Sequence, residues 1–259
     1  VANDEQKERV VQLIKRIGDH IVDNNYHLID FDGKPTRWGI WHPDSLNNAP
    51  NWIYERGLNA LQFLSFMKTA SFFTKDPKFE KHYQLLVNKH GYAQNALHAK
   101  QFGPFETSHS DDILNFFPYY NLLRYSQNDP HRATYIKSLK RSWKAVQNDH
   151  MPVWNVFASA LLNQDCDLDI ALKEIQEYPI DLIDWTMDNS HRWDIQLDPL
   201  ISRFKRKQAN RPIPTPESGI SRWNTNPKEL KSGADGKIED SGTYFLFAYW
   251  MGRYNGYWE

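Results

Sequence analysis

The sequence predicts an all-α protein whose helical hairpins form an incomplete (α/α) toroid. Three observations favour this fold class: long apolar segments have helical spacing, nearly apolar helices alternate with amphipathic ones along the chain, and little of the chain alternates as a half-buried strand would. A closed ring of six hairpins needs more helices than these segments supply. We therefore expect an incomplete ring or a truncated chain, with a plain helical bundle as the alternative.

The predicted helices are of two kinds. Residues 8–24 form an amphipathic helix, because Val10, Leu13 and Ile17 recur on one face. Further amphipathic helices are predicted over 78–90, 132–148 and 168–178. Segments that are apolar around most of their circumference, and are therefore expected to be buried, cover 51–74, 108–125, 153–162 and 241–254. A strand is the alternative for the last of these, which is rich in aromatic residues.

Two stretches show no clear helical period. Residues 26–51 are rich in Pro, Gly, Asp and Trp, and we expect a long ordered loop there with a short strand at 27–31. Residues 179–239 are expected to form a long irregular segment within a single domain that spans 1–259. Long ordered loops in compact domains often carry function.

Composition excludes several classes of protein. Lys and Arg number 31 against 32 Asp and Glu, and this near balance argues against a nucleic-acid partner. No apolar run approaches the roughly 20 residues that span a bilayer, so no membrane partner is expected. The one cysteine, Cys166, allows no Cys-rich zinc site, and no paired-histidine or glycine-rich nucleotide motif occurs. We therefore expect neither a metal nor a cofactor.

Aromatic residues are unusually frequent, with 10 Trp, 13 Tyr and 14 Phe. Many Trp residues stand beside Asn, Asp, His or Arg, as in Trp41-His42 and Arg222-Trp223-Asn224. Flat rings next to hydrogen-bonding groups suit sugars, which offer apolar C–H faces and hydroxyl edges. Trp also fills cores and interfaces, and that interpretation stays open.

Carboxylates gather at the starts of the predicted buried helices. Glu55 precedes one, Asp111 and Asp112 begin another, and Glu239 and Asp240 precede the last. If the inner helices run the same way, these ends meet, and paired carboxylates are what glycoside hydrolysis uses. Acids at helix N-termini also cap backbone N–H groups, which is the alternative explanation for any one of them.

Two further patterns add polar groups to this proposed site. Glu55, Asn59 and Gln62 form a polar stripe on an otherwise apolar helix, so they face either a wet cavity or a polar partner. The loop at 184–194 is dense in hydrogen-bonding side chains, and its Arg192 could hold a carboxylate. A well-capped structural loop is the alternative there.

Several strings resemble a little-characterised group of bacterial helical domains that are similar to six-hairpin toroid glycosidases. They are WGIWHPDSLN (38–47), YERGLNALQFLSF (54–66), HSDDILNFFPYYNLLRY (109–125), DWTMDNSHRWDIQLDP (184–199) and RWNTNP (222–227). The resemblance implies the toroid fold and supplies no catalytic residues. It also implies a larger exported protein, periplasmic or extracellular, with further helical sequence before the position of Val1.

The sequence therefore predicts a carbohydrate-active domain, with glycoside hydrolysis as the leading function. Asp111 or Asp112 would work with Glu55 as the catalytic carboxylates. The side chains expected to position the sugar are Trp38, Trp41, Arg56, Asn59, His109, Arg192 and Trp223.

Two alternatives remain open. One is a polysaccharide lyase with a His or Tyr base and Arg192 as a carboxylate clamp. The other is a non-catalytic module that binds a glycan or a partner domain. The expected partners are an oligo- or polysaccharide and either a neighbouring domain or a second copy, because the end hairpins of an incomplete ring leave apolar flanks uncovered.

Overall fold

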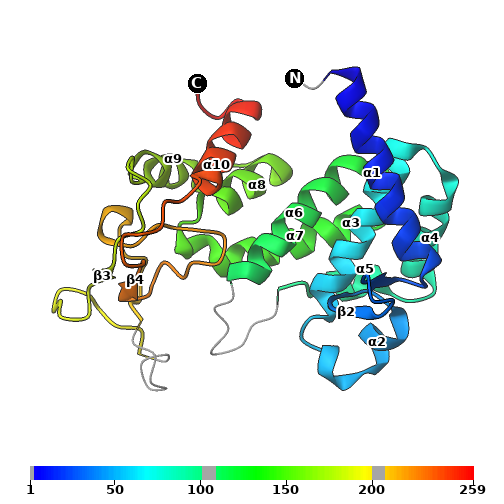
Figure 1. Ribbon diagram of the computed structural model, residues 1–259, viewed down its shortest axis with the longest axis horizontal. Coiled ribbons are helices and arrows are strands. Elements are labelled where there is room, and N and C mark those ends of the chain that lie inside the picture. The colour runs from blue at the N-terminus through cyan, green and yellow to red at the C-terminus, as the bar shows by residue number, and fades with distance from the viewer. Residues whose placement is uncertain (1–2, 101–108, 200–207) are drawn as a thin grey trace. The chain divides into compact units, whose positions relative to one another are not determined.

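The computed structural model describes residues 3–100, 109–199 and 208–259, and these are mostly helical (Figure 1). Contacts group the chain into two compact units. Unit 1 comprises residues 1–101 and 114–139, and unit 2 comprises residues 102–113 and 140–259. The predicted all-α class is confirmed, whereas the toroid arrangement stays a prediction.

Unit 1 is built around helix α3 (Arg56–Thr74), which packs against α1 (Asp4–Asp23), α4 (Pro77–Asn88) and α5 (Tyr92–Ala96). The predicted burial of this segment is confirmed, because α3 hides side chains around most of its circumference. Its fully buried apolar side chains include Leu61, Phe63, Leu64 and Met67. Burying one such side chain contributes roughly 1.5–3 kcal/mol. Helix α5 was not predicted from the sequence.

Helix α1 lies closely against α4 at a glycine. A Cβ atom at Gly18 would stand 2.6 Å from Cε1 of Phe79, so only glycine lets the ring approach this far. Both helices are capped at their N-termini. Asn3 and Gln6 form a capping box on α1, and Asp76 accepts a hydrogen bond from the Lys78 N–H on α4.

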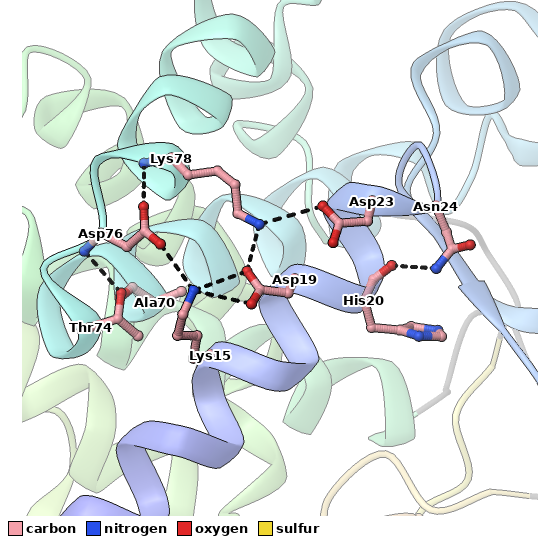
Figure 2. Close-up of polar contacts among 9 residues, drawn as sticks. All are labelled: Lys15, Asp19, His20, Asp23, Asn24, Ala70, Thr74, Asp76 and Lys78. Atoms are coloured by element: carbon pink, nitrogen blue, oxygen red, sulfur yellow. Dashed lines mark hydrogen bonds and ion pairs between the residues drawn. The ribbon is translucent and has the colours of Figure 1, made fainter.

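A network of ion pairs also joins these two helices (Figure 2). Lys15 Nζ lies 3.1 Å from Asp19 Oδ2 and 3.0 Å from Asp76 Oδ2. Lys78 Nζ lies 2.6 Å from Asp19 Oδ1 and 3.4 Å from Asp23 Oδ1. Hydrogen bonds from the Lys78 backbone and the Lys15 ammonium lower the pKa of Asp76. Each carboxylate in the network has a lysine partner, so we assign it a structural role.

The stretch predicted as a long ordered loop, 26–51, contains more regular secondary structure than expected. The predicted strand forms as β1, but it pairs antiparallel with a second strand that was not predicted. Gly33, with φ +77°, lets the chain reverse between them, and the Asp30 N–H donates to the Lys34 carbonyl at 2.8 Å. The elements of this stretch are β1 (His27–Ile29), β2 (Pro35–Ile40), α2 (Pro43–Asn48) and a 3₁₀ turn, η1 (Pro50–Trp52).

Helices α6 (His109–Tyr125) and α7 (Arg132–Val146) contribute residues to both units. In unit 1 they are joined by a buried hydrogen bond of 2.6 Å between the Tyr119 hydroxyl and Ser138 Oγ. The Ser138 hydroxyl also donates to the Ala96 carbonyl at the end of α5. A 3₁₀ turn, η2 (Gln147–Asp149), follows α7 in unit 2.

Unit 2 packs α8 (Pro152–Leu162) against α9 (Leu168–Gln176) and α10 (Thr243–Tyr254). Within residues 241–254, for which a strand was the alternative, Thr243–Tyr254 form a helix. The predicted burial of this helix is wrong, because only Ala248 and Gly252 are buried in it and Trp250 is 58% exposed. Over 179–239, where a long irregular segment is predicted, the described residues form the short antiparallel pair β3 (Met187–Asp188) and β4 (Lys231–Ser232) and a 3₁₀ turn, η4 (Thr215–Glu217). Among the helices of the described ranges, none is long and apolar enough to cross a membrane.

Candidate functional site

Unit 1 holds five of the residues predicted to form a sugar site, and they have different environments. Trp38 on β2 is 80% exposed, whereas Trp41 is buried against Phe63, with ring centroids 5.8 Å apart. Glu55 is exposed and does not cap α3 with its side chain. Of these two tryptophans, Trp38 is therefore the one that offers an indole face to solvent.

The remaining unit 1 candidates lie on α3. Arg56 donates to the backbone carbonyls of Leu46 and Asn47, so its guanidinium caps the end of α2. Asn59 is buried, and Gln62 accepts a hydrogen bond of 3.4 Å from the Trp41 indole. One member of the predicted polar stripe thus has a polar partner within the unit.

Unit 2 holds the other candidates. Asp112 is buried and Asp111 is half-buried at the start of α6. Arg192 is held by Asp194, with Nη2 2.6 Å from Oδ2, and by Glu217. Trp223 is 53% exposed. Since Glu55 belongs to the other unit, a pocket that it shares with Asp111 and Asp112 stays a prediction.

The structure brings His109 and Asp112 together and adds Asp149, which was not predicted from the sequence. His109 Nδ1 lies 3.7 Å from Asp112 Oδ2, and Nε2 lies 3.8 Å from Asp149 Oδ2. We call these three residues the His109 cluster. All are buried, the Trp154 ring packs edge-on against the imidazole, and Lys228 pairs with Asp149. An imidazole between two carboxylates can take up, orient or pass on a proton.

Asp149 also lines a small cavity in unit 2, whose wall combines polar and apolar side chains. The cavity holds about 20 Å³, which is room for about one water molecule. A second carboxylate, Glu174, lines it and accepts a hydrogen bond from Thr215. Burial raises the pKa of the Tyr178 and Tyr244 phenols in its wall, so both stay neutral at ordinary pH. The cavity is too small for a sugar ring.

Unit 1 contains a much larger recess, an open groove of about 750 Å³. We call it the Lys68 groove. Its lining comes from α3, α4, the end of α6 and the loop that follows: Lys68, Phe72, Glu80, Gln84 and residues 124–130. A groove of this size falls within the range of sites that bind small molecules.

A lysine with two acidic partners forms the floor of the groove. Lys68 Nζ lies 2.9 Å from Glu80 Oε1 and 3.0 Å from Asp129 Oδ2. It also stands 3.9 Å from the centroid of the Tyr83 ring, within the range of a cation–π interaction. Burial raises the pKa of Tyr83, which shares a hydrogen bond of 2.6 Å with the Tyr135 hydroxyl. The floor of the groove is therefore an ammonium group that two carboxylates hold in place and that lies against the uncharged Tyr83 ring.

One wall of the groove is aromatic and the rim is polar. Phe72 is 44% exposed and stacks on Tyr125, with centroids 4.5 Å apart and planes 26° from parallel. Phe73 packs edge-on against both of these rings. Gln84, Gln127 and Asn128 place amide groups along the lining. Aromatic rings beside hydrogen-bonding groups are also the combination that predicted a sugar site at the Trp residues.

None of the residues that line the Lys68 groove was predicted from the sequence, although one signal was present. Lys68 places a charge in the middle of a mostly apolar and buried helix, and a buried lysine requires an acidic partner. Its partners come from distant parts of the chain, so the sequence alone does not identify them. Within the described residues, no group of three or more His, Cys, Asp or Glu side chains is arranged to hold a metal ion.

Comparison with protein-family models, with curated proteins and with solved structures found no match to this chain.

Proposed function

We propose that the chain binds carbohydrate, and that it does so in the Lys68 groove of unit 1. The observation that supports this most directly is the pairing of an exposed aromatic wall with amide side chains in an open groove of about 750 Å³. The rings of Phe72 and Tyr125 suit the apolar C–H faces of a sugar. The amides of Gln84, Gln127 and Asn128 can both donate to and accept from its hydroxyl groups.

Affinity electrophoresis in gels that contain a dissolved polysaccharide tests this proposal. Tyr125→Ala removes half of the aromatic wall and should restore free migration in any gel that retards the wild type. Phe31→Ala is the matched control, because Phe31 is 98% exposed and lies outside the groove. Trp38→Ala tests the site predicted from the sequence. If Trp38→Ala abolishes retardation and Tyr125→Ala does not, the groove is the wrong site.

Glycoside hydrolysis is the second candidate, and the His109 cluster supports it. Asp112 has 1% of its surface exposed and lies next to a histidine that also approaches Asp149. Glycosidases need two carboxyl groups, one of which holds a proton, and a buried His–carboxylate cluster can control that proton. The small cavity beside Asp149 means that a substrate could enter only if this part of unit 2 opens.

Release of reducing sugar from a panel of polysaccharides tests this second candidate. Asp112→Asn and Asp149→Asn should each abolish any activity that the wild type shows. Asp169→Asn is the control, because Asp169 is exposed in the first turn of α9. Glu55→Gln and Asp111→Asn test the carboxylates predicted from the sequence. If all four site variants are as active as the wild type, none of these carboxylates takes part in hydrolysis.

The finer predictions on architecture, assembly and location remain proposals. Helix α1 leaves three apolar residues half-exposed, Val10, Leu13 and Ile17. A neighbouring domain or a second copy would cover this surface, as proposed for an incomplete ring. Sedimentation equilibrium tests the second copy, and an experimental structure tests the ring. A periplasmic or extracellular location rests only on the resemblance described above.

A further inference from the structure

We propose that Glu80 makes the Lys68 groove selective for uncharged sugar chains. The inference rests on the proposed function, since it concerns which carbohydrates the groove admits. Glu80 neutralises a lysine that would otherwise attract acidic sugars, and it is the partner of that lysine that borders solvent.

The two acidic partners of Lys68 are exposed to very different degrees. The Asp129 side chain is 1% exposed and Lys68 is 11% exposed, so this pair belongs to the interior. The Glu80 side chain is 40% exposed. Gln84 donates to Glu80 Oε1 at 2.9 Å, which fixes the carboxylate over the lysine. Glu80 is therefore the partner of Lys68 that a ligand approaching from solvent can reach.

The charges that line the groove sum to zero. Lys68 and Arg124 are cationic, and Glu80 and Asp129 are anionic. A uronic acid residue that approached Lys68 would meet the Glu80 carboxylate, and like charges at close range repel. A neutral hydroxyl meets no such repulsion and can accept a hydrogen bond from the lysine or donate one to the carboxylate.

Glu80→Gln tests the role of this carboxylate with little change in shape. The amide keeps an oxygen that can accept a hydrogen bond from Lys68, but the groove gains one unit of positive charge. Affinity for polygalacturonate should rise about fivefold or more at low salt, as expected for two unit charges about 4 Å apart in water. Added salt should reduce this gain. Affinity for neutral polysaccharides such as β-glucan or galactomannan should change much less.

Glu5→Gln is the matched control, because Glu5 is exposed at the start of α1 and the substitution changes the net charge equally. The wild type supplies a second measurement that does not depend on a variant: its binding to neutral chains should be insensitive to salt. The proposal is overturned if the wild type binds polygalacturonate as well as it binds neutral chains, or if Glu80→Gln and Glu5→Gln behave alike. If neither protein binds any polysaccharide, the proposed function fails together with this inference.

Discussion

Replacing Lys68 by Met should destabilise unit 1 strongly. Met retains most of the apolar stem but removes the ammonium, which leaves the Asp129 carboxylate without its counterion. Asp129 cannot turn to water readily, because its side chain is 1% exposed and the lost partner lies 3.0 Å away. The loss of one partner of a buried ion pair usually costs about 3–5 kcal/mol.

The contrast with the other partner makes this prediction specific. Glu80→Gln should cost about 1 kcal/mol or less, because Glu80 is 40% exposed and partly exposed pairs contribute little. Asp129→Asn leaves Lys68 paired with Glu80 and should cost less than Lys68→Met. The double variant Lys68→Met with Asp129→Asn should be more stable than Lys68→Met alone, since it removes the uncompensated charge.

Urea unfolding followed by far-ultraviolet circular dichroism measures these differences, with the slope of the transition checked for each variant. If Lys68→Met unfolds within about 1 kcal/mol of the wild type, Asp129 does not depend on the lysine as described. A double variant that is less stable than Lys68→Met would also contradict the account.

Three further predictions concern other parts of the chain. Gly18→Ala should lower the free energy of unfolding in urea by about 1–3 kcal/mol, because the new Cβ would stand 2.6 Å from the Phe79 ring. Gly33→Ala is the control: no atom lies within 4 Å of its new Cβ, so it should show only the cost of a positive φ. The pKa of Asp76 is lowered in the folded state, so the stability that its ionised carboxylate contributes should be complete above the ordinary aspartate range and lost as pH falls through the lowered pKa. Asn also caps a helix, so Asp76→Asn removes only the charge. The melting temperatures of wild type and Asp76→Asn should therefore converge in acid. Burial raises the pKa of the Cys166 thiol, so native protein should react with a thiol reagent far more slowly than unfolded protein, and equal rates would contradict this.

Much of the helical framework could be predicted from the sequence because its signals are local. The segment predicted as a buried helix at 51–74 is apolar on nearly every side, and its residues from Arg56 onward form the buried helix α3, whereas the first five residues form turns. The aromatic segment at 241–254 could have been a helix or a strand, and only the packing of α10 on α8 resolves this. The second strand of the hairpin and the short helix α5 were missed, because elements of five or six residues carry too few positions to show a period.

The candidate sites were predictable only where their residues are close in sequence. His109 and Asp112 stand three residues apart at a helix start, and they do lie together. Asp149 joins them from the end of another helix, and no sequence pattern relates it to His109. Lys68 could be singled out in the sequence as a charge on a buried helix. Its partners Glu80 and Asp129 could not, because they reach it only through the packing of α3, α4 and α6. Tertiary packing, and not local sequence, creates the groove.

The most direct test of the central claim is a nuclear magnetic resonance titration of isotope-labelled protein with oligosaccharides from whichever neutral polysaccharide retards it. We predict that chemical-shift changes concentrate on Phe72, Gln84 and Tyr125, with saturation transfer from the aromatic wall to the sugar, and that Trp38 is unaffected. Changes confined to Trp38 or to residues of unit 2, or no change with any neutral chain tested, would contradict carbohydrate binding in the Lys68 groove.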